Sequence, residues 1–213
     1  MVSFREILFI LPVAALLVIL GAAGAGTAKK AVCADNLRQI YRAAQSYSAD
    51  NNGMIVPSFV SPGAGRRTYW AEFLLPYIRQ VGNFYCPADS KGQRGMVKHD
   101  LLPLMFDLRY VSYGISYYIS STGRQASAAL PYNINAVADP SYVVYFGDAA
   151  ILQLRPTSGC WKRDWNPVHE SQGANYVMAD GHVEFFTGSN PGLYDKLPGW
   201  KQDRKRWKNW KKL

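Results

Sequence analysis

The hydrophobic and polar positions divide the chain into an apolar N-terminal run, a mixed middle and a basic C-terminal end. Ile7–Gly26 contains no charged residue, and about 20 apolar residues are enough for a helix to cross a bilayer. The run follows Arg5 and Glu6 and ends before Lys29 and Lys30. This pattern predicts a single hydrophobic stem that leads into a globular body.

The residues after the stem have the spacing of an amphipathic helix. From Lys30 to about Asn52, apolar side chains recur three or four positions apart, which is the period of one helix face. Asp50 to Gly53 then reads as a helix stop. Together with the stem, the pattern predicts a helix of about 45 residues, which Gly21–Gly26 are expected to weaken locally. Besides Cys33, four side chains should hold this helix on the body, Leu37, Ile40, Ala44 and Tyr47.

Shorter patterns predict an antiparallel sheet. The expected strands are Val111–Ser120, Ser141–Phe146, Asn175–Ala179 and His182–Phe186. The last two flank Asp180 and Gly181, and two strand-like runs on either side of Asp-Gly are typical of a hairpin. Residues 54–68 are expected to form a loop, Tyr69–Arg79 a short helix and Asn83–Asp89 the end of a strand. A helix followed by antiparallel strands indicates an α+β fold.

Charge separates the C-terminal end from the body. The formal net charge is +9, and residues 200–213 hold seven Lys or Arg and one Asp. The expected domains are therefore a stem at 1–29, a globular domain at 30–199 and a basic tail at 200–213. The tail carries aromatic and cationic side chains, Trp200, Arg204, Lys205, Arg206, Trp207, Lys208, Trp210, Lys211 and Lys212. As a helix, this tail would suit an anionic membrane surface, a polyanion or a phosphate backbone. The alternative is that its tryptophans pack on the domain or on a neighbouring subunit.

The cysteines allow two interpretations. The chain has three of them, Cys33, Cys86 and Cys160. No two form a Cys-x-x-Cys pair, and the histidines that could join them are His99, His169 and His182. A structural zinc site is therefore not expected. If the body lies outside the cytoplasm, a disulfide between Cys86 and Cys160 is expected; the alternative is three buried free thiols.

The stem has three competing interpretations: a cleaved signal peptide, a plain membrane anchor, and a pilin-type stem. Glu6 favours the third, because an acidic residue at the start of a membrane helix is costly unless it meets a cation. Once Met1 is removed, Glu6 is the fifth residue. Type IV pilins and type II secretion pseudopilins carry a glutamate at that position. This similarity implies that Glu6 pairs with the N-terminal amine of a neighbouring subunit, here that of Val2.

Several motifs along the body occur in a specific order. The segment Cys33–Ile40 is followed by Tyr47–Gly53, by Cys86–Asp89, and by His169 ahead of Ala179–Val183. Over residues 33–187 the chain resembles pseudopilin-like proteins with the prepilin-type H-X9-DG C-terminal domain, although ten residues separate the histidine from the aspartate here. The resemblance implies a pilin-like fold, a long N-terminal helix laid on an antiparallel sheet. It also implies a filament or secretion-system subunit.

The motif residues His169, Asp180, Gly181 and His182 are expected to hold the hairpin together rather than to catalyse a reaction. Asp180 should occupy the first turn position, where aspartate tolerates a left-handed conformation. No cofactor or metal is expected, although some pseudopilins bind calcium near the C-terminus and Asp180 could contribute an oxygen. No Gly-x-Ser-x-Gly elbow, phosphate-binding glycine loop or His-Glu-x-x-His helix occurs in the sequence, so an enzyme is not expected.

These features together predict a structural subunit that forms a helical homo-oligomeric filament. It would span the inner membrane once, with its globular domain outside the cytoplasm, and would reach the cell surface or the exterior after assembly. Its other partners would be the secretion or pilus assembly machinery. The alternative is a monomeric, membrane-tethered binding protein that uses residues 200–213 to bind an anionic polymer, a lipid or a nucleic acid.

Overall fold

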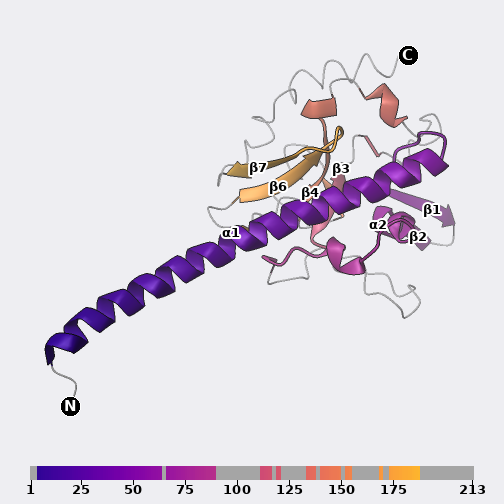
Figure 1. The fold of residues 1–213 in the computed structure, drawn as a ribbon. Helices are drawn as coiled ribbons and strands as arrows, with labels where there is room; N and C mark the ends of the chain where they lie inside the picture. The colour runs from indigo at the N-terminus through magenta and orange to yellow at the C-terminus, as the bar shows by residue number, and fades with distance from the viewer. Residues whose placement is uncertain are drawn as a thin grey trace.

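The computed structural model describes residues 4–63, 66–89, 111–116, 119–120, 133–137, 140–149, 152–154, 168–169 and 173–187. Of residues 4–23 and 25, and of some strand and turn positions, it describes the backbone only. Within this part of the chain, one long helix lies on antiparallel strands (Figure 1). The architecture is therefore α+β, as the sequence predicts.

Helix α1 runs without interruption over Phe4–Asp50, 47 residues, or about 70 Å at 1.5 Å per residue. The weakening expected at Gly21–Gly26 does not end the helix, since a glycine lowers helix propensity but removes no backbone hydrogen bond. Asn52 and Gly53 end it with positive φ angles of 55° and 78°. The amide of Gly53 then donates to the carbonyl of Ser48 at 2.7 Å, so the predicted stop is observed.

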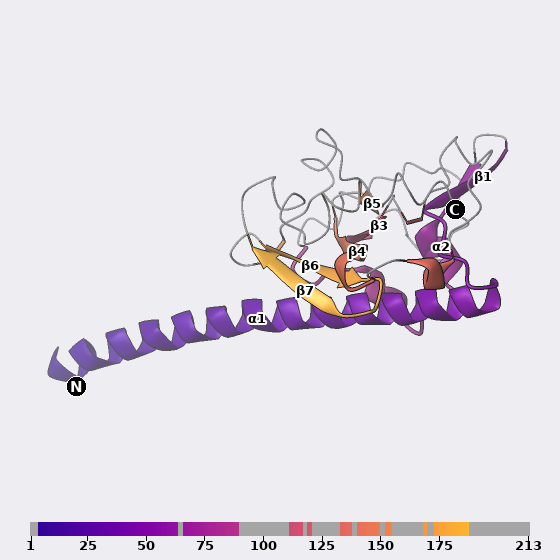
Figure 2. The same cartoon turned by 90° about the horizontal axis from the view of Figure 1, so that it is seen from above.

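The two halves of α1 have different surroundings. The C-terminal half crosses the body beside β6 and β4, whereas the N-terminal half projects away from the body (Figures 1 and 2). In the part of the chain that the structure describes, no helix has both the length and the apolar character that a membrane span needs.

The main sheet has five strands in the order β5-β3-β4-β6-β7. These strands are β3 (Tyr113–Ser116), β4 (Val144–Asp148), β5 (Gln153–Leu154), β6 (Gly173–Met178) and β7 (Val183–Thr187). All neighbouring pairs are antiparallel except β3 and β5. The last pair is the predicted hairpin, registered from Gly173 opposite Thr187 to Val177 opposite Val183.

The smaller elements differ from the sequence predictions. Residues 54–68, expected to be a loop, contain β1 (Phe59–Gly63) and the start of β2 (Arg66–Tyr69), which form a two-stranded sheet. The expected strand end at Asn83–Asp89 begins instead inside a 3-10 helix, η1 (Val81–Phe84). The predicted strand at Ser141 starts only at Val144, because η3 (Pro140–Tyr142) precedes it and proline fixes a φ that suits such a turn. The remaining elements are α2 (Trp70–Leu74) and η2 (Ile134–Ala136).

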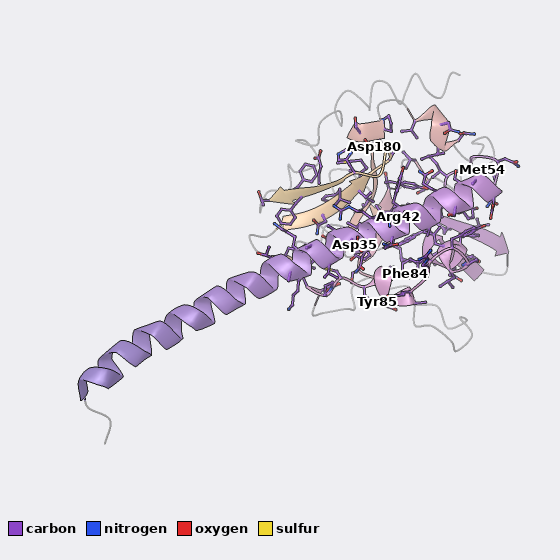
Figure 3. The ribbon with its side chains drawn as sticks, viewed as in Figure 1. Asp35, Arg42, Met54, Phe84, Tyr85 and Asp180 are labelled. Atoms are coloured by element: carbon purple, nitrogen blue, oxygen red, sulfur yellow. The ribbon has the colours of Figure 1, made fainter. Side chains whose placement is uncertain are left out.

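The core lies between α1 and the sheet. Leu37, Ile40 and Ala44 are buried there, and Tyr47 is half-buried. Trp70 of α2 is fully buried and its indole nitrogen donates to the carbonyl of Leu152 at 3.0 Å. Figure 3 shows the described side chains of the body gathered around the C-terminal half of α1. The helix is thus anchored to the body by one face of its second half.

Candidate functional site

Four side chains that are distant in sequence meet in the core, and each can bind a metal ion. They are Cys33, Cys86, Asp148 and His169. One ligand atom from each lies within 4.8 Å of the corresponding atoms of the other three. Every one of these residues is more than nine-tenths buried. The group could therefore hold a metal ion away from solvent.

Each of the four residues comes from a different element. Cys33 lies on the buried face of α1, one turn before Leu37. Cys86 follows η1, and Asp148 is the last residue of β4. His169 is bridged to the start of β6, where its amide donates to the Gly173 carbonyl at 3.3 Å. The site therefore forms only when α1 is seated on the sheet.

The four side chains contact one another directly. The Cys33 thiol donates to Oδ1 of Asp148 at 3.0 Å. Nε2 of His169 lies 3.3 Å from Oδ2 of the same carboxylate and 3.6 Å from the sulfur of Cys86. Nδ1 of His169 has no hydrogen-bond partner among the described residues. The imidazole thus presents Nε2 to the cluster.

Neighbouring polar groups orient the ligand side chains. The Tyr113 hydroxyl donates to the Cys33 sulfur at 3.4 Å, and the Asn36 amide donates to that hydroxyl at 3.3 Å. The backbone amide of Asn175 donates to Oδ2 of Asp148 at 2.6 Å. These donors stabilise negative charge on the cysteine and on the aspartate.

Burial and these contacts shift the pKa values of the two cysteines in opposite directions. Burial raises the pKa of the Cys33 thiol well above its ordinary range. The neighbouring Cys33 side chain lowers the pKa of Cys86 to about 6 against the effect of burial, and His169 adds to the lowering. Burial lowers the pKa of His169, but hydrogen bonds to Asp148 and Cys86 outweigh it and raise that pKa to about 9. These two pKa shifts favour a Cys86 thiolate beside a charged His169.

A thiolate, an imidazole and a carboxylate also occur together in nucleophilic catalysis. Here Cys86 is 4% exposed and His169 is 5% exposed, and a nucleophile must reach its substrate. The burial therefore suits a structural centre better than a catalytic one.

Sequence reasoning missed this cluster because it considered only histidines as additional ligands. Asp148 could have indicated the cluster, because a carboxylate within the apolar run Val144–Ala150 must have a buried partner. Cys33 already lay on the predicted buried face of α1. What the sequence lacks is any short spacing between the ligands, since Cys33 and Asp148 are 115 positions apart.

The hairpin residues lie in a different arrangement from the one predicted. The amide of Gly181 donates to the carbonyl of Met178 at 2.9 Å, and Gly181 has a φ of 93°. Among the described residues, Asn52 is the only non-glycine residue with a positive φ. Asp180 is therefore not left-handed as expected; the glycine takes that conformation, as in a three-residue hairpin loop. The Asp180 carboxylate instead accepts from the amide of His182 at 3.1 Å.

The histidine and the aspartate of the resemblance motif belong to two separate places. His169 pairs with Gly173, the first residue of β6, and Asp180 lies two positions after Met178, its last residue. Six strand residues span roughly 20 Å. Asn175, in the middle of β6, directs its amide nitrogen to Nε2 of His169 at 3.1 Å. In Figure 3, Asp180 lies on the side of α1 opposite Tyr85, the residue before Cys86.

Several predicted site residues lie outside the described part of the chain. These are Val2, Cys160 and the tail residues 200–213, together with the side chain of Glu6. Cys86 is a free, buried thiol in the structure, and because Cys160 lies outside the described residues, the disulfide between them stays a prediction. The described neighbours of Cys86 include Cys33 and His169.

No protein-family model matches this chain, and neither a curated protein nor a solved structure matches it significantly. Its function must therefore be inferred from its own residues and their arrangement.

Proposed function

We propose that this chain is a structural subunit of a pilus-like or pseudopilus-like filament and that it assembles through the N-terminal half of α1. The observation that carries the proposal is the division of this helix. One half is packed into the core through Leu37, Ile40 and Ala44, while the other stands clear of the body (Figure 2). A helix half that is free of its own domain is available to neighbouring subunits.

The amino acids of the free half support this role. The apolar run Ile7–Gly26 belongs to it, and an uncharged run of that length can lie in a bilayer before assembly. Val32, at its junction with the body, is 51% exposed. In a filament, the stems of neighbouring subunits would cover these apolar residues and remove their area from water or lipid.

In this proposal Glu6 sets the register between subunits. Its carboxylate would pair with the N-terminal amine of a neighbouring Val2, because a charge in an apolar bundle requires an opposite charge. The subunit would first be held in the inner membrane with its body outside the cytoplasm. Its other partners would be the machinery that assembles a pilus or a secretion pseudopilus. The role is structural rather than enzymatic.

The test compares Glu6→Ala with Arg5→Ala in cells that produce the full chain. We expect Glu6→Ala to abolish filaments in sheared surface material viewed by electron microscopy, while the chain stays in the membrane fraction. Arg5→Ala is the matched control one position away, and it should still assemble. Normal filaments from Glu6→Ala would exclude the proposed pairing.

A second variant addresses the binding-protein alternative. Deleting residues 200–213 should leave filaments intact if the chain is a filament subunit. If wild-type cells form no filaments, and the deletion abolishes binding to anionic vesicles or to a polyanion, the tethered monomer is the correct function.

A further inference from the structure

We propose that one zinc ion ties α1 to the sheet in the folded protein. Its ligands would be the four buried side chains described above, Cys33, Cys86, Asp148 and His169. The inference is independent of the filament role, since it concerns how the body itself is held together.

The donor set points to zinc. Two thiolates, one imidazole nitrogen and one carboxylate oxygen are the ligand types that zinc takes in four-coordinate sites. Calcium and magnesium prefer oxygen donors throughout, so the two cysteines argue against them. Because structural zinc sites have four protein ligands and no open position, the complete burial of the cluster fits a structural ion.

The spacing of the donors also fits. With metal–ligand bonds of about 2.0–2.3 Å, neighbouring donors of a tetrahedral site lie roughly 3.3–3.8 Å apart. The Asp148 carboxylate lies 3.3 Å from Nε2 of His169, and that nitrogen lies 3.6 Å from the Cys86 sulfur. The Cys33 sulfur is 3.0 Å from Oδ1, whereas His169 contacts the other oxygen, Oδ2. Since the four ligand atoms lie within 4.8 Å of one another, side-chain shifts of up to about 1 Å would bring them to tetrahedral spacing.

Nε2 of His169 faces both a hydrogen-bond acceptor and a hydrogen-bond donor, and a bound ion would remove this conflict. Its Nε2 lies 3.3 Å from an Asp148 oxygen, which can only accept, and 3.1 Å from the Asn175 amide nitrogen, which can only donate. One nitrogen cannot serve both. With zinc on the Nε2 lone pair, the carboxylate binds the ion instead of an imidazole proton. The side-chain amide of Asn175 would keep its hydrogen bond to the carbonyl of Lys30, which lies 3.4 Å away.

Hydrogen-bond donors next to the cluster complete the site. Two thiolates and a carboxylate carry one more negative charge than zinc neutralises. The hydroxyl of Tyr113 donates to the Cys33 sulfur, and the backbone amide of Asn175 donates to Asp148. Donors of this kind orient metal ligands and disperse their charge. Tyr113 is thus a positioning residue for the ion.

The ion would join segments that the sequence keeps far apart. Cys33 lies near the point at which α1 enters the body, whereas Asp148 and His169 belong to the sheet side. Zinc would therefore fix the helix at this junction. If the filament role also holds, a mechanical force on the stem would be transmitted to the body at this junction.

The first experiment measures zinc in the full chain, purified in detergent with a reductant, by elemental mass spectrometry. We expect one zinc per chain in the wild type. Cobalt substitution should give thiolate-to-metal charge-transfer bands and the visible bands of a tetrahedral ion. Four variants should lose the metal: Cys33→Ser, Cys86→Ser, Asp148→Asn and His169→Gln. Two matched controls on the β6–β7 turn should retain it, Asp180→Asn and His182→Gln.

A conservative variant keeps the test valid if a ligand variant fails to fold. Tyr113→Phe removes only the hydroxyl that donates to Cys33. It should weaken zinc binding by roughly 10–100-fold and leave the circular dichroism spectrum of the zinc-bound protein unchanged. Chelation should lower the melting temperature of the wild type, and zinc alone should restore it.

Two results would overturn the proposal. One is a wild-type chain that contains no zinc and takes up none when zinc alone is added. The other is a Cys33–Cys86 disulfide found by non-reducing peptide mapping, because both thiols would then be unavailable as ligands.

Discussion

At the scale of single residues, Asp180 and His182 show how a short motif acts locally. The carboxylate of Asp180 accepts from the amide and lies 2.6 Å from the ring Nδ1 of His182, whose Nε2 lies 3.0 Å from Glu184. Tyr41 of α1 reaches the same turn and donates to the carbonyl of Ala179 at 3.2 Å. The Asp-Gly turn therefore also contacts the helix, a role that hairpin signals alone do not reveal.

The charge on His182 should depend on its two carboxylate neighbours. Although burial lowers the pKa of His182, hydrogen bonds to Glu184 and Asp180 outweigh it and raise that pKa above its ordinary value. The resulting stabilisation is present below the unfolded pKa of about 6.5 and is lost as pH rises through the folded pKa. It should be small, because exposed ion pairs contribute little.

An NMR titration of His182 checks directly whether its pKa is raised. Asp180→Asn and Glu184→Gln should each lower the pKa of His182 toward its ordinary value, while Arg42→Ala on α1 should not. A wild-type pKa at or below about 6.5 would contradict the expected carboxylate contacts.

At the scale of elements, α1 is bound to the body by one face of its second half. Ile40 is fully buried there, while Arg42 on the same helix is exposed. The repeat of apolar residues from Leu37 to Ala44 predicted that face, since helical spacing depends on nearby residues alone. The short 3-10 helix η1 was not predicted; its Phe84 carbonyl accepts from the distant amide of Ser112 at 2.9 Å, a contact that no local pattern encodes.

Truncation of the helix face should loosen α1 from the sheet. Ile40→Ala removes buried methyl groups and should lower the free energy of unfolding by about 2–5 kcal/mol. Arg42→Ala is the matched control two positions away and should change it by less than about 0.5 kcal/mol. Urea unfolding of the full chain in detergent, followed by circular dichroism, measures both. Equal effects from the two variants would contradict the observed packing face.

At the scale of the whole molecule, the protein consists of a body and a projecting helix half (Figure 1). Lys30 of α1 contacts the body, since its ammonium lies 4.3 Å from the centre of the Phe185 ring. Just before it, Ala28 and Lys29 are exposed. The stem should therefore contribute to assembly and little to the fold.

A truncated chain of residues 30–213 tests this separation. It should fold with a melting temperature within about 4 °C of the full chain, a difference of roughly 1 kcal/mol. It should stay monomeric in size-exclusion chromatography and form no filaments. A truncated chain that unfolds would mean that the stem also supports the body, contrary to the contacts seen.

The sequence by itself determined the features that depend on neighbouring residues. The long helix, its end near Gly53 and the β6–β7 hairpin follow from local spacing and turn chemistry, and all three are observed. Only the tertiary structure decided that Cys33 meets Cys86, Asp148 and His169. The physical reason is that these side chains come together through the docking of α1 on the sheet, and no local pattern encodes a contact across 115 positions.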